Sequence, residues 1–500
     1  MNKINLHRSM PCMFLLYMVL FCLPSAYADQ KGDMQISTKS PQARALFQEG
    51  LTKIEALHEQ AGLADWRKAV QADPKFALAH ILITFFTQDP AEQVAEREKA
   101  LATRQFAGQE EQIIIDWLAN ASQSLWLPAI QSMNEALQHY PQDKHVAWLA
   151  GWWLILNQKQ PAKAIPLFER AIRIDPKFAD PWNEVAYCYA KTGEFDKAFD
   201  RMKKYTELLP NEANPQDSFA EISRLAGRYE EALLHYHLSL KIDPTFNESQ
   251  LGLGDTYALM GEEAKARAEY AVAIQKGTKV QSSLWGLQSA ATYVREGNLS
   301  GADIAFQAVA QQAHANDFGN LEAEAYRSMA LYQKDSSKAM DLLQKAEATL
   351  REKHQVPQGV LDEEMAAVLR TRTERALQDG NMELATASLK LLEGMAEANS
   401  DGVVQSHYSG ASGAMLLAQA KYEDAISRLE EDEDNPFSMQ RLVQAHQKTG
   451  DKQSAERIAQ KLAKYNEPLI EQAVVVLPFR KSRATSSELK SPRQELAMEW

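Results

Sequence analysis

Cysteine is scarce in this sequence of 500 residues, which contains only Cys12, Cys22 and Cys188. The first two lie in an N-terminal segment that we expect to be removed, so the mature chain would keep a single cysteine and could form no internal disulfide. Its fold must then be stabilised by packing alone. Cys188 lies between two tyrosines, which favours a buried hydrophobic role over a reactive thiol.

Positive charge is also in short supply. The sequence has 54 Lys and Arg residues against 67 Asp and Glu residues, a net charge of −13. Nucleic-acid binding requires a basic surface, so we expect no nucleic-acid partner. The sequence also lacks a phosphate-binding glycine loop, a paired-histidine zinc helix and a nucleophile elbow. We therefore expect no enzyme activity, no catalytic residue, no cofactor and no metal site.

The N-terminus lacks an apolar run long enough to span a membrane. The run Met13–Leu23 is shorter than the roughly 20 apolar residues that a spanning helix needs. Basic residues precede it, and the small-x-small pattern of Ala26 and Ala28 follows it, which is typical of a secretory signal peptide. We expect cleavage between Ala28 and Asp29 and a periplasmic or secreted protein.

Glycine and proline recur at regular intervals along the sequence. Gly193, Gly227, Gly261 and Gly297 are separated by 34, 34 and 36 residues, and prolines at 176, 210 and 244 by 34. Apolar residues recur between them at three- and four-residue spacing, which indicates one face of a helix. Glycine then ends the first helix of each unit, and proline ends the second.

This pattern resembles the tetratricopeptide repeat family. The stretch 164–176 is similar to the second helix and terminal proline of that repeat, and Asp73–Ala77 repeats Asp175–Ala179. The resemblance is most specific over 145–310. It implies an all-α, right-handed superhelical solenoid of stacked antiparallel helix pairs, with about ten or eleven repeats. Together with the N-terminal segment, it suggests an exported bacterial member of the family.

The repeat pattern also divides the chain. We expect five segments: a signal peptide at 1–28, a linker at 29–40, an N-terminal array at 41–280, a divergent C-terminal array at 281–465 and a tail at 466–500. Within the tail, 474–477 is compatible with a short strand or the closing turn of a capping helix. The basic, serine-rich remainder is typical of disorder, so we expect the tail to be partly disordered.

The family resemblance implies a concave groove lined by the first helix of each repeat. Trp152 and Trp153 are neighbours, about 100° apart on a helix, so they cannot both face inward. We expect Trp153 in the groove as a binding hot spot. The carboxylates of Asp217 and Glu221 argue against the type of repeat that binds acidic tails. The groove residues implied in this way are Trp153, Asn157, Asn183, Tyr187, Lys191, Asp217, Glu221, Arg224, Asp255 and Arg295.

The sequence therefore predicts an exported scaffold that binds protein or peptide partners in its concave groove. The alternative is a scaffold for envelope assembly or polysaccharide export that docks peripherally on a membrane complex. The sequence contains no signal for the oligomeric state.

Overall fold

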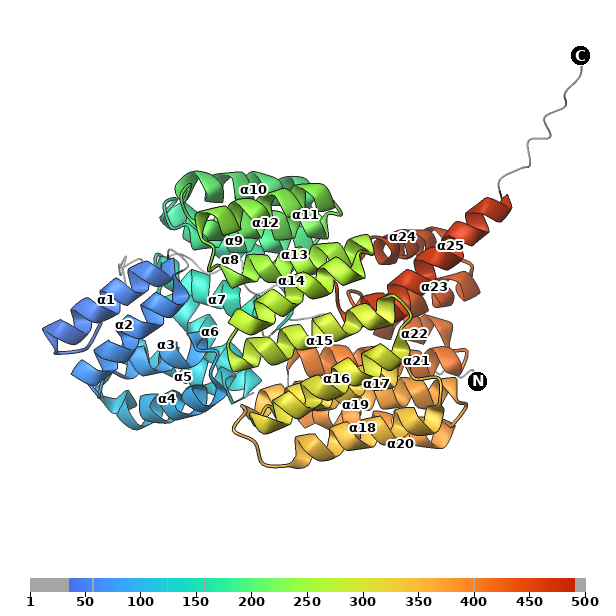
Figure 1. The fold of residues 1–500 in the computed structure, drawn as a ribbon. Helices are drawn as coiled ribbons and strands as arrows, with labels where there is room; N and C mark the ends of the chain where they lie inside the picture. The colour runs from blue at the N-terminus through green and yellow to red at the C-terminus, as the bar shows by residue number, and fades with distance from the viewer. Residues whose placement is uncertain (1–35, 56–57, 124, 157, 399–400, 491–500) are drawn as a thin grey trace, which may run out of the picture.

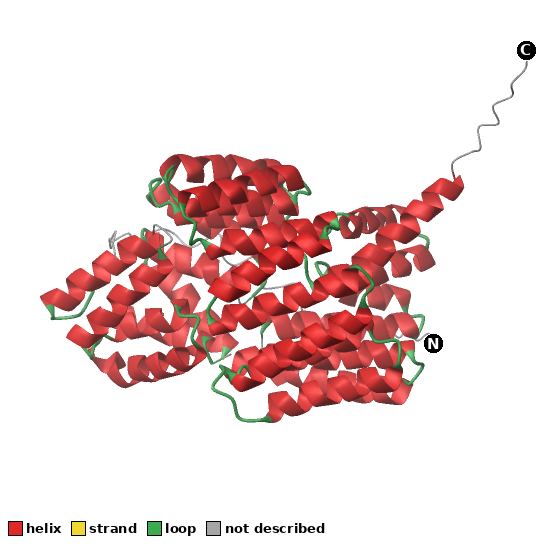
Figure 2. Cartoon of the chain, in the orientation of Figure 1, coloured by secondary structure: helices red, strands yellow, loops and turns green. Residues whose placement is uncertain are grey.

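The computed structural model of the chain describes residues 36–55, 58–123, 125–156, 158–398 and 401–490. Every regular element in these ranges is a helix (Figure 2), and they contain no β-strand. The predicted signal peptide at 1–28 lies outside the described residues, as do the first part of the predicted linker and the last ten residues of the predicted tail. Among the described helices, none combines the length and the apolar character needed to cross a membrane.

The helices are taken in chain order as two sets, although the last helix of the first set packs against the first helix of the second as other neighbouring helices do. The predicted boundary at 280 remains a prediction. The first set is α1 (Pro41–Glu55), α2 (Glu59–Ala72), α3 (Ala77–Phe86), α4 (Pro90–Thr103), η1 (Arg104–Phe106), α5 (Gln109–Ala121), α6 (Trp126–His139), α7 (Lys144–Leu156), α8 (Pro161–Ile174), α9 (Asp180–Lys191), α10 (Phe195–Leu208), α11 (Ala213–Leu225), α12 (Tyr229–Ile242), α13 (Asn247–Met260) and α14 (Glu263–Lys276). The second set is α15 (Lys279–Arg295), α16 (Leu299–Ala315), α17 (Gly319–Tyr332), α18 (Ser336–Arg351), α19 (Gln358–Gln378), α20 (Met382–Ala398), α21 (Gly402–Ala418), α22 (Tyr422–Leu429), η2 (Glu430–Asp432), α23 (Pro436–Thr449), α24 (Lys452–Ala463), the π-helix η3 (Gln472–Val476) and α25 (Leu477–Lys490).

Successive helices pair as hairpins, from α1 with α2 to α23 with α24, and the hairpins stack side by side (Figure 1). The described residues form twelve such hairpins, against the ten or eleven expected from the sequence. Residues 84–109 match the repeat pattern poorly, yet they contain α4, which completes a hairpin with α3. The predicted all-α solenoid of stacked helix pairs is confirmed.

The spaced glycines are the hairpin turns. Gly193, Gly227, Gly261 and Gly297 follow the first helices α9, α11, α13 and α15, and their φ angles are +80°, +77°, +80° and +82°. A side chain disfavours this left-handed backbone, whereas glycine adopts it readily. The glycines spaced by about 34 residues therefore mark the turn within each of these hairpins.

Close helix crossings account for glycines inside helices. A Cβ atom on Gly254 of α13 would lie 2.6 Å from the ring of Tyr270 on α14. A Cβ atom on Gly252 would lie 2.2 Å from the ring of Tyr236 on α12. Both tyrosines are buried, so the small residues allow α13 to pack tightly against the helices on either side of it.

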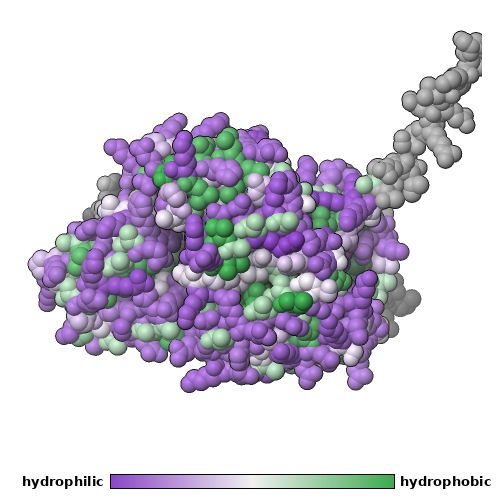
Figure 3. All heavy atoms as spheres, in the orientation of Figure 1, coloured by the Kyte–Doolittle hydropathy of each residue, from purple (hydrophilic) through white to green (hydrophobic). Residues whose placement is uncertain are grey.

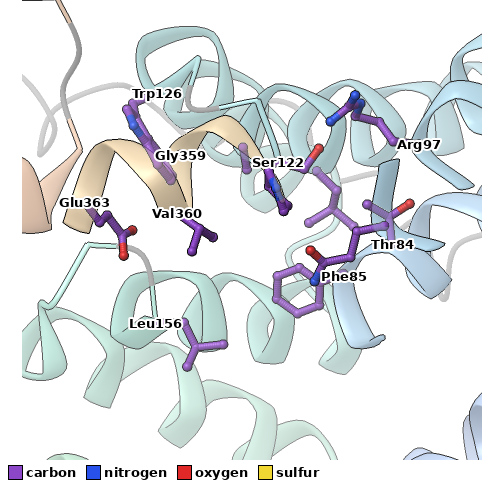
Figure 4. Close-up of a pocket in the computed structure, with 13 residues that line it drawn as sticks. Thr84, Phe85, Arg97, Ser122, Trp126, Leu156, Gly359, Val360 and Glu363 are labelled. Carbon is purple, nitrogen blue, oxygen red and sulfur yellow. The ribbon is translucent and has the colours of Figure 1, made fainter. Parts of the chain in front are cut away.

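The solenoid brings hairpins that are distant in the sequence into contact. A Cβ atom on Gly402, at the start of α21, would lie 2.6 Å from the main-chain oxygen of Gln158, after α7. Beside this contact, the helices α3 to α7 and the start of α19 enclose a cavity of about 180 Å³. Phe85, Leu156 and Val360 are among the residues that line it (Figure 4).

The outer surface is mostly hydrophilic in the view of Figure 3. An exception lies over α10 to α12, where hydrophobic groups gather. On α12, Leu234, Leu238 and Ile242 are exposed at four-residue spacing. This helix therefore has an apolar stripe on the side that faces away from its hairpin partner.

Candidate partner-binding groove

The first helices of successive hairpins face a common groove, because their side chains meet a single segment of the chain. Lys191 of α9, Arg224 of α11 and Arg295 of α15 all contact residues 466–472. Arg327 of α17 approaches the same segment at 3.8 Å. One short segment therefore touches four first helices, and these helices line one inner face, as the family resemblance implied.

Asn466 attaches this segment beside the turn after α11. The Arg224 guanidinium donates to the main-chain oxygen of Asn466 at 3.3 Å, and the Tyr229 hydroxyl donates to its side-chain oxygen at 2.7 Å. The Asn466 amide in turn donates to the main-chain oxygen of Leu225 at 3.3 Å. The groove thus binds a polypeptide segment through both its main chain and its side chain.

The same segment continues into the hydrophobic core. Ile470 and Ala473 are buried against the later hairpins, and Val475 and Val476 are buried against α22 to α24. Of the two alternatives for residues 474–477, the structure shows a helix and not a strand, and η3 leads directly into α25. That the tail is partly disordered remains a prediction.

Trp153 is not a groove residue. Its side chain is fully buried, with its ring centroid 6.1 Å from that of Trp117 and 6.1 Å from that of Trp126. Trp152 is the half-buried member of the pair, and its indole N–H donates to Asp180 at 3.0 Å. The rule that the two tryptophans cannot both face inward holds, but the expected assignment was wrong, and Trp153 cannot contact a partner.

Two of the predicted groove residues are buried acids that accept hydrogen bonds from hydroxyl groups, and Asp255 also lies 3.9 Å from the guanidinium of Arg224. Asp217 is 8% exposed and Asp255 is 5% exposed. The Ser249 hydroxyl lies 2.6 Å from Asp217, and the Tyr270 hydroxyl donates to Asp255 at 2.6 Å. Asn183 is also buried, and its amide donates to the neighbouring glutamate. These side chains form the floor of the groove rather than its rim.

The accessible part of the predicted set is smaller. Tyr187 and Glu221 are half-buried, and the Tyr187 hydroxyl donates to Glu221 at 2.8 Å. Arg224 and Arg295 lie beneath the segment 466–472. Asn157 lies outside the described residues. That any of these residues binds a partner remains a prediction.

Sequence reasoning missed the carboxyl groups at the start of α9, because Asp180 matches a helix cap. The structure places it in the groove wall, where the indoles of Trp148 and Trp152 donate to its side chain. Glu184 follows one turn later and is also buried. These two acids are four residues apart, and Asp217 and Glu221 on α11 have the same spacing. This repeated spacing is the signal that could have revealed them.

We name this set the acidic side of the groove: Glu59 of α2, Asp180 and Glu184 of α9, Asp217 of α11 and Glu248 of α13. Burial raises the pKa of Asp180 to about 7 and that of Asp217 to about 8. Burial also raises the pKa of Glu184, and the charges of Asp180 and Glu59 raise it further. Ionisation of the carboxyl groups on the acidic side is therefore unfavourable in the folded chain.

The cavity in Figure 4 does not form a catalytic arrangement. Of its lining residues, Ser122 uses its hydroxyl to donate to the main-chain oxygen of Ala119 at 3.0 Å. Burial raises the pKa of Glu363 to about 7, and the hydroxyl of Thr84, which also lines the cavity, donates to the main-chain oxygen of His80 at 3.2 Å. Nor do the described residues contain three His, Cys, Asp or Glu side chains placed to hold a metal ion. That the chain is not an enzyme and needs no cofactor remains a prediction.

Stacked helix hairpins with an inner groove define a helical-repeat scaffold. Residues 156–217 match the family described as "Tetratricopeptide repeat". This range covers α8, α9, α10 and the turns between them, where the repeat geometry is regular. Residues 156–217 are therefore similar to tetratricopeptide repeats.

Two curated relatives resemble a short part of the chain. "Superkiller complex protein 3" of Mus musculus is 30% identical over 118 residues, which is 24% of this chain and 8% of that protein. "Superkiller protein 3" of Schizosaccharomyces pombe is 28% identical over 117 residues, 23% of this chain and 8% of that protein. The matched segment thus spans less than a tenth of either relative, and both are eukaryotic.

Solved structures align over more of the chain at lower identity. The crystal structure of the APC/C hetero-tetramer Cut9-Hcn1 is 13% identical, covers 85% of this chain and 78% of its own, and has a TM-score of 0.43. Yeast Tom70 is 15% identical, covers 85% of this chain and 99% of its own, and has a TM-score of 0.41. The fold assignment rests on the hairpins of this chain and not on these alignments.

Proposed function

We propose that this chain is a non-catalytic scaffold that binds segments of partner proteins in its inner groove. One observation carries the proposal: the groove already holds a non-helical segment of polypeptide, residues 465–469, which it contacts through the main chain and side chains. Rigid hairpins preorganise such a surface and lower the ordering cost of binding. The half-buried Tyr187 and Glu221 lie on the same inner face and remain accessible.

The proposal is tested with a random peptide library displayed on phage, using peptides of about 12 residues, which span roughly 40 Å when extended. Peptides selected on the full chain are then measured on two variants. Tyr187→Ala, in the groove, should weaken binding roughly tenfold or more. Lys203→Ala, on the outer helix α10 and 67% exposed, should leave binding unchanged.

Circular dichroism should show the same helix content in both variants, so that a loss of binding is not a loss of fold. Selection of no peptide, or equal binding by both variants, would contradict the proposal.

We further propose that the protein is exported to a periplasmic or extracellular location. The basic residues, apolar run and small-residue pattern within residues 1–28 support this. Removal of these residues should retain the protein in the cytoplasm, as measured by cell fractionation. An unchanged distribution would contradict the proposal. Docking on a membrane complex for envelope assembly or polysaccharide export is a narrower version of the same proposal.

A further inference from the structure

The two sides of the inner groove differ in charge. Lys191 and Arg295 end their first helices and Arg224 lies one residue from the end of α11, and the chain's own segment 466–472 covers this basic side. The acidic side lies along the N-terminal halves of α9, α11 and α13. Glu467 of the covering segment pairs with Lys191, so the segment's own negative charge is directed to the basic side.

The buried carboxyl groups of the acidic side form no ion pair with a described side chain, although the charge of Arg224 partly offsets the rise that burial causes in the pKa of Asp217. Asp180, Glu184 and Asp217 receive hydrogen bonds only from indole, amide and hydroxyl groups. None of the three forms an ion pair with a described Lys, Arg or His side chain. Buried carboxylates are normally paired, so this part of the groove is an exception.

The next hairpins show the usual arrangement. Glu263 lies 3.0 Å from the guanidinium of Arg295. Glu374 lies 2.9 Å from that of Arg370 and 2.8 Å from that of Arg441. The same solenoid thus pairs its buried carboxylates with arginine further along the chain. The lack of an ion pair is therefore local to Asp180 and Glu184 of α9 and Asp217 of α11, whereas Glu221 of α11 pairs with Arg224 at 3.0 Å.

A second, independent observation also indicates a missing donor. The Oδ1 atoms of Asp180 and Asn183 have no hydrogen-bond partner, although Asp180 is fully buried and Asn183 is only 4% exposed. The amide of Asn183 donates to Glu184, so its free oxygen belongs to the same cluster. Buried acceptors are rarely left unsatisfied unless a ligand or water completes them.

We propose that the acidic side of the groove binds a lysine or arginine side chain of an extended partner segment. This inference rests on the proposed function and names the chemistry of the partner. A long aliphatic stem carries the ammonium or guanidinium group of these residues to a carboxyl group below the surface. Entry is from the rim, where Glu59 is half-buried and Glu248 is exposed.

The test uses the peptides selected on the full chain in the library experiment. We expect the selected peptides to be enriched in lysine and arginine. Replacement of one such lysine by norleucine, or of one such arginine by citrulline, should weaken binding about tenfold, because a charge-assisted hydrogen bond is lost. Asp217→Asn and Glu184→Gln should produce a similar loss. Glu207→Gln, on the outer helix α10 and 67% exposed, should produce none.

The outcomes separate the two proposals. If the selected peptides bind in the groove but tolerate the loss of every cationic residue, the acidic side does not select a cation, and the scaffold proposal stands. The same conclusion follows if Asp217→Asn and Glu184→Gln bind as the wild type does. If no groove-dependent peptide is selected, the scaffold proposal itself fails. Both variants keep the shape of the side chain and bury no ionisable group, so they should fold, as circular dichroism would verify.

Discussion

At the scale of single residues, the unpaired carboxyl groups make stability depend on pH in an unusual direction. The pKa of Asp217 is about 8 in the folded chain, compared with about 3.9 for an unfolded aspartate. Between these values the unfolded chain loses a proton that the folded chain keeps. The contribution of Asp217 to stability is therefore present at low pH and is lost as the pH rises toward 8.

We expect Asp217→Asn to be more stable than the wild type, by an amount that grows between pH 5 and pH 8 to on the order of a few kcal/mol. An amide at this position still accepts from Ser249 but has no charge to bury. Urea unfolding at several pH values measures the difference. Asp243→Asn is the control, because hydrogen bonds from Thr245 lower the pKa of Asp243; its difference should be constant over this range. A constant difference for Asp217→Asn would contradict the prediction.

Residue positions were the least predictable part of the groove. Trp153 was expected at its surface and lies in the core instead. The prolines at 141 and 176 are 35 residues apart rather than 34, and one extra residue turns a helix face by about 100°. Sequence spacing therefore could not decide which of two adjacent tryptophans faces inward. Packing against Trp117 and Trp126 decides it.

At the scale of helices and hairpins, most of the structure was predictable, because local backbone preferences determine it. Glycines at hairpin turns have positive φ angles at the expected positions. Inside α13, Gly254 packs closely against the ring of Tyr270 of the same repeat. These features depend on residues within one repeat, which is why the sequence alone revealed them.

Two glycines inside helices should respond oppositely to the same substitution. Gly254→Ala places a methyl group against the buried Tyr270 ring and should destabilise the chain by about 1–3 kcal/mol. Gly394→Ala, on α20, meets nothing within 4 Å and should stabilise it by about 0.5–1 kcal/mol through helix propensity. Chemical unfolding measures both. Stabilisation by Gly254→Ala would show that the crossing is looser than described.

At the scale of the whole molecule, the packing of residues 466–472 in the groove could not be predicted from sequence patterns. The contacts of Asn466 with Arg224 and Tyr229 join residues 242 and 237 positions apart. No repeat rule connects such distant positions, because each repeat contacts mainly its neighbours. The basic, serine-rich composition after residue 480 instead pointed to a loose tail.

The attachment of this segment is measurable by amide hydrogen exchange. Asn466→Ala removes the hydrogen bonds with Tyr229 and with the main chain of Leu225. We expect exchange in residues 466–472 to become roughly tenfold faster, since each bond contributes about 1 kcal/mol. Exchange in α1 and α2 should not change, and Asn211→Ala, at an exposed turn, should have no effect on the segment. Unaltered exchange at 466–472 would show that Asn466 does not hold it.

The position of this segment near the C-terminus has a consequence for biosynthesis. Residues 466–472 leave the ribosome after residues 333–465, the 133 residues (465 − 332) that follow α17, which takes roughly ten seconds or more at typical translation rates. During that interval the nascent chain presents Lys191, Arg224 and Arg295 uncovered. An acidic polypeptide that engages them early competes with residues 466–472 for the same three cationic side chains.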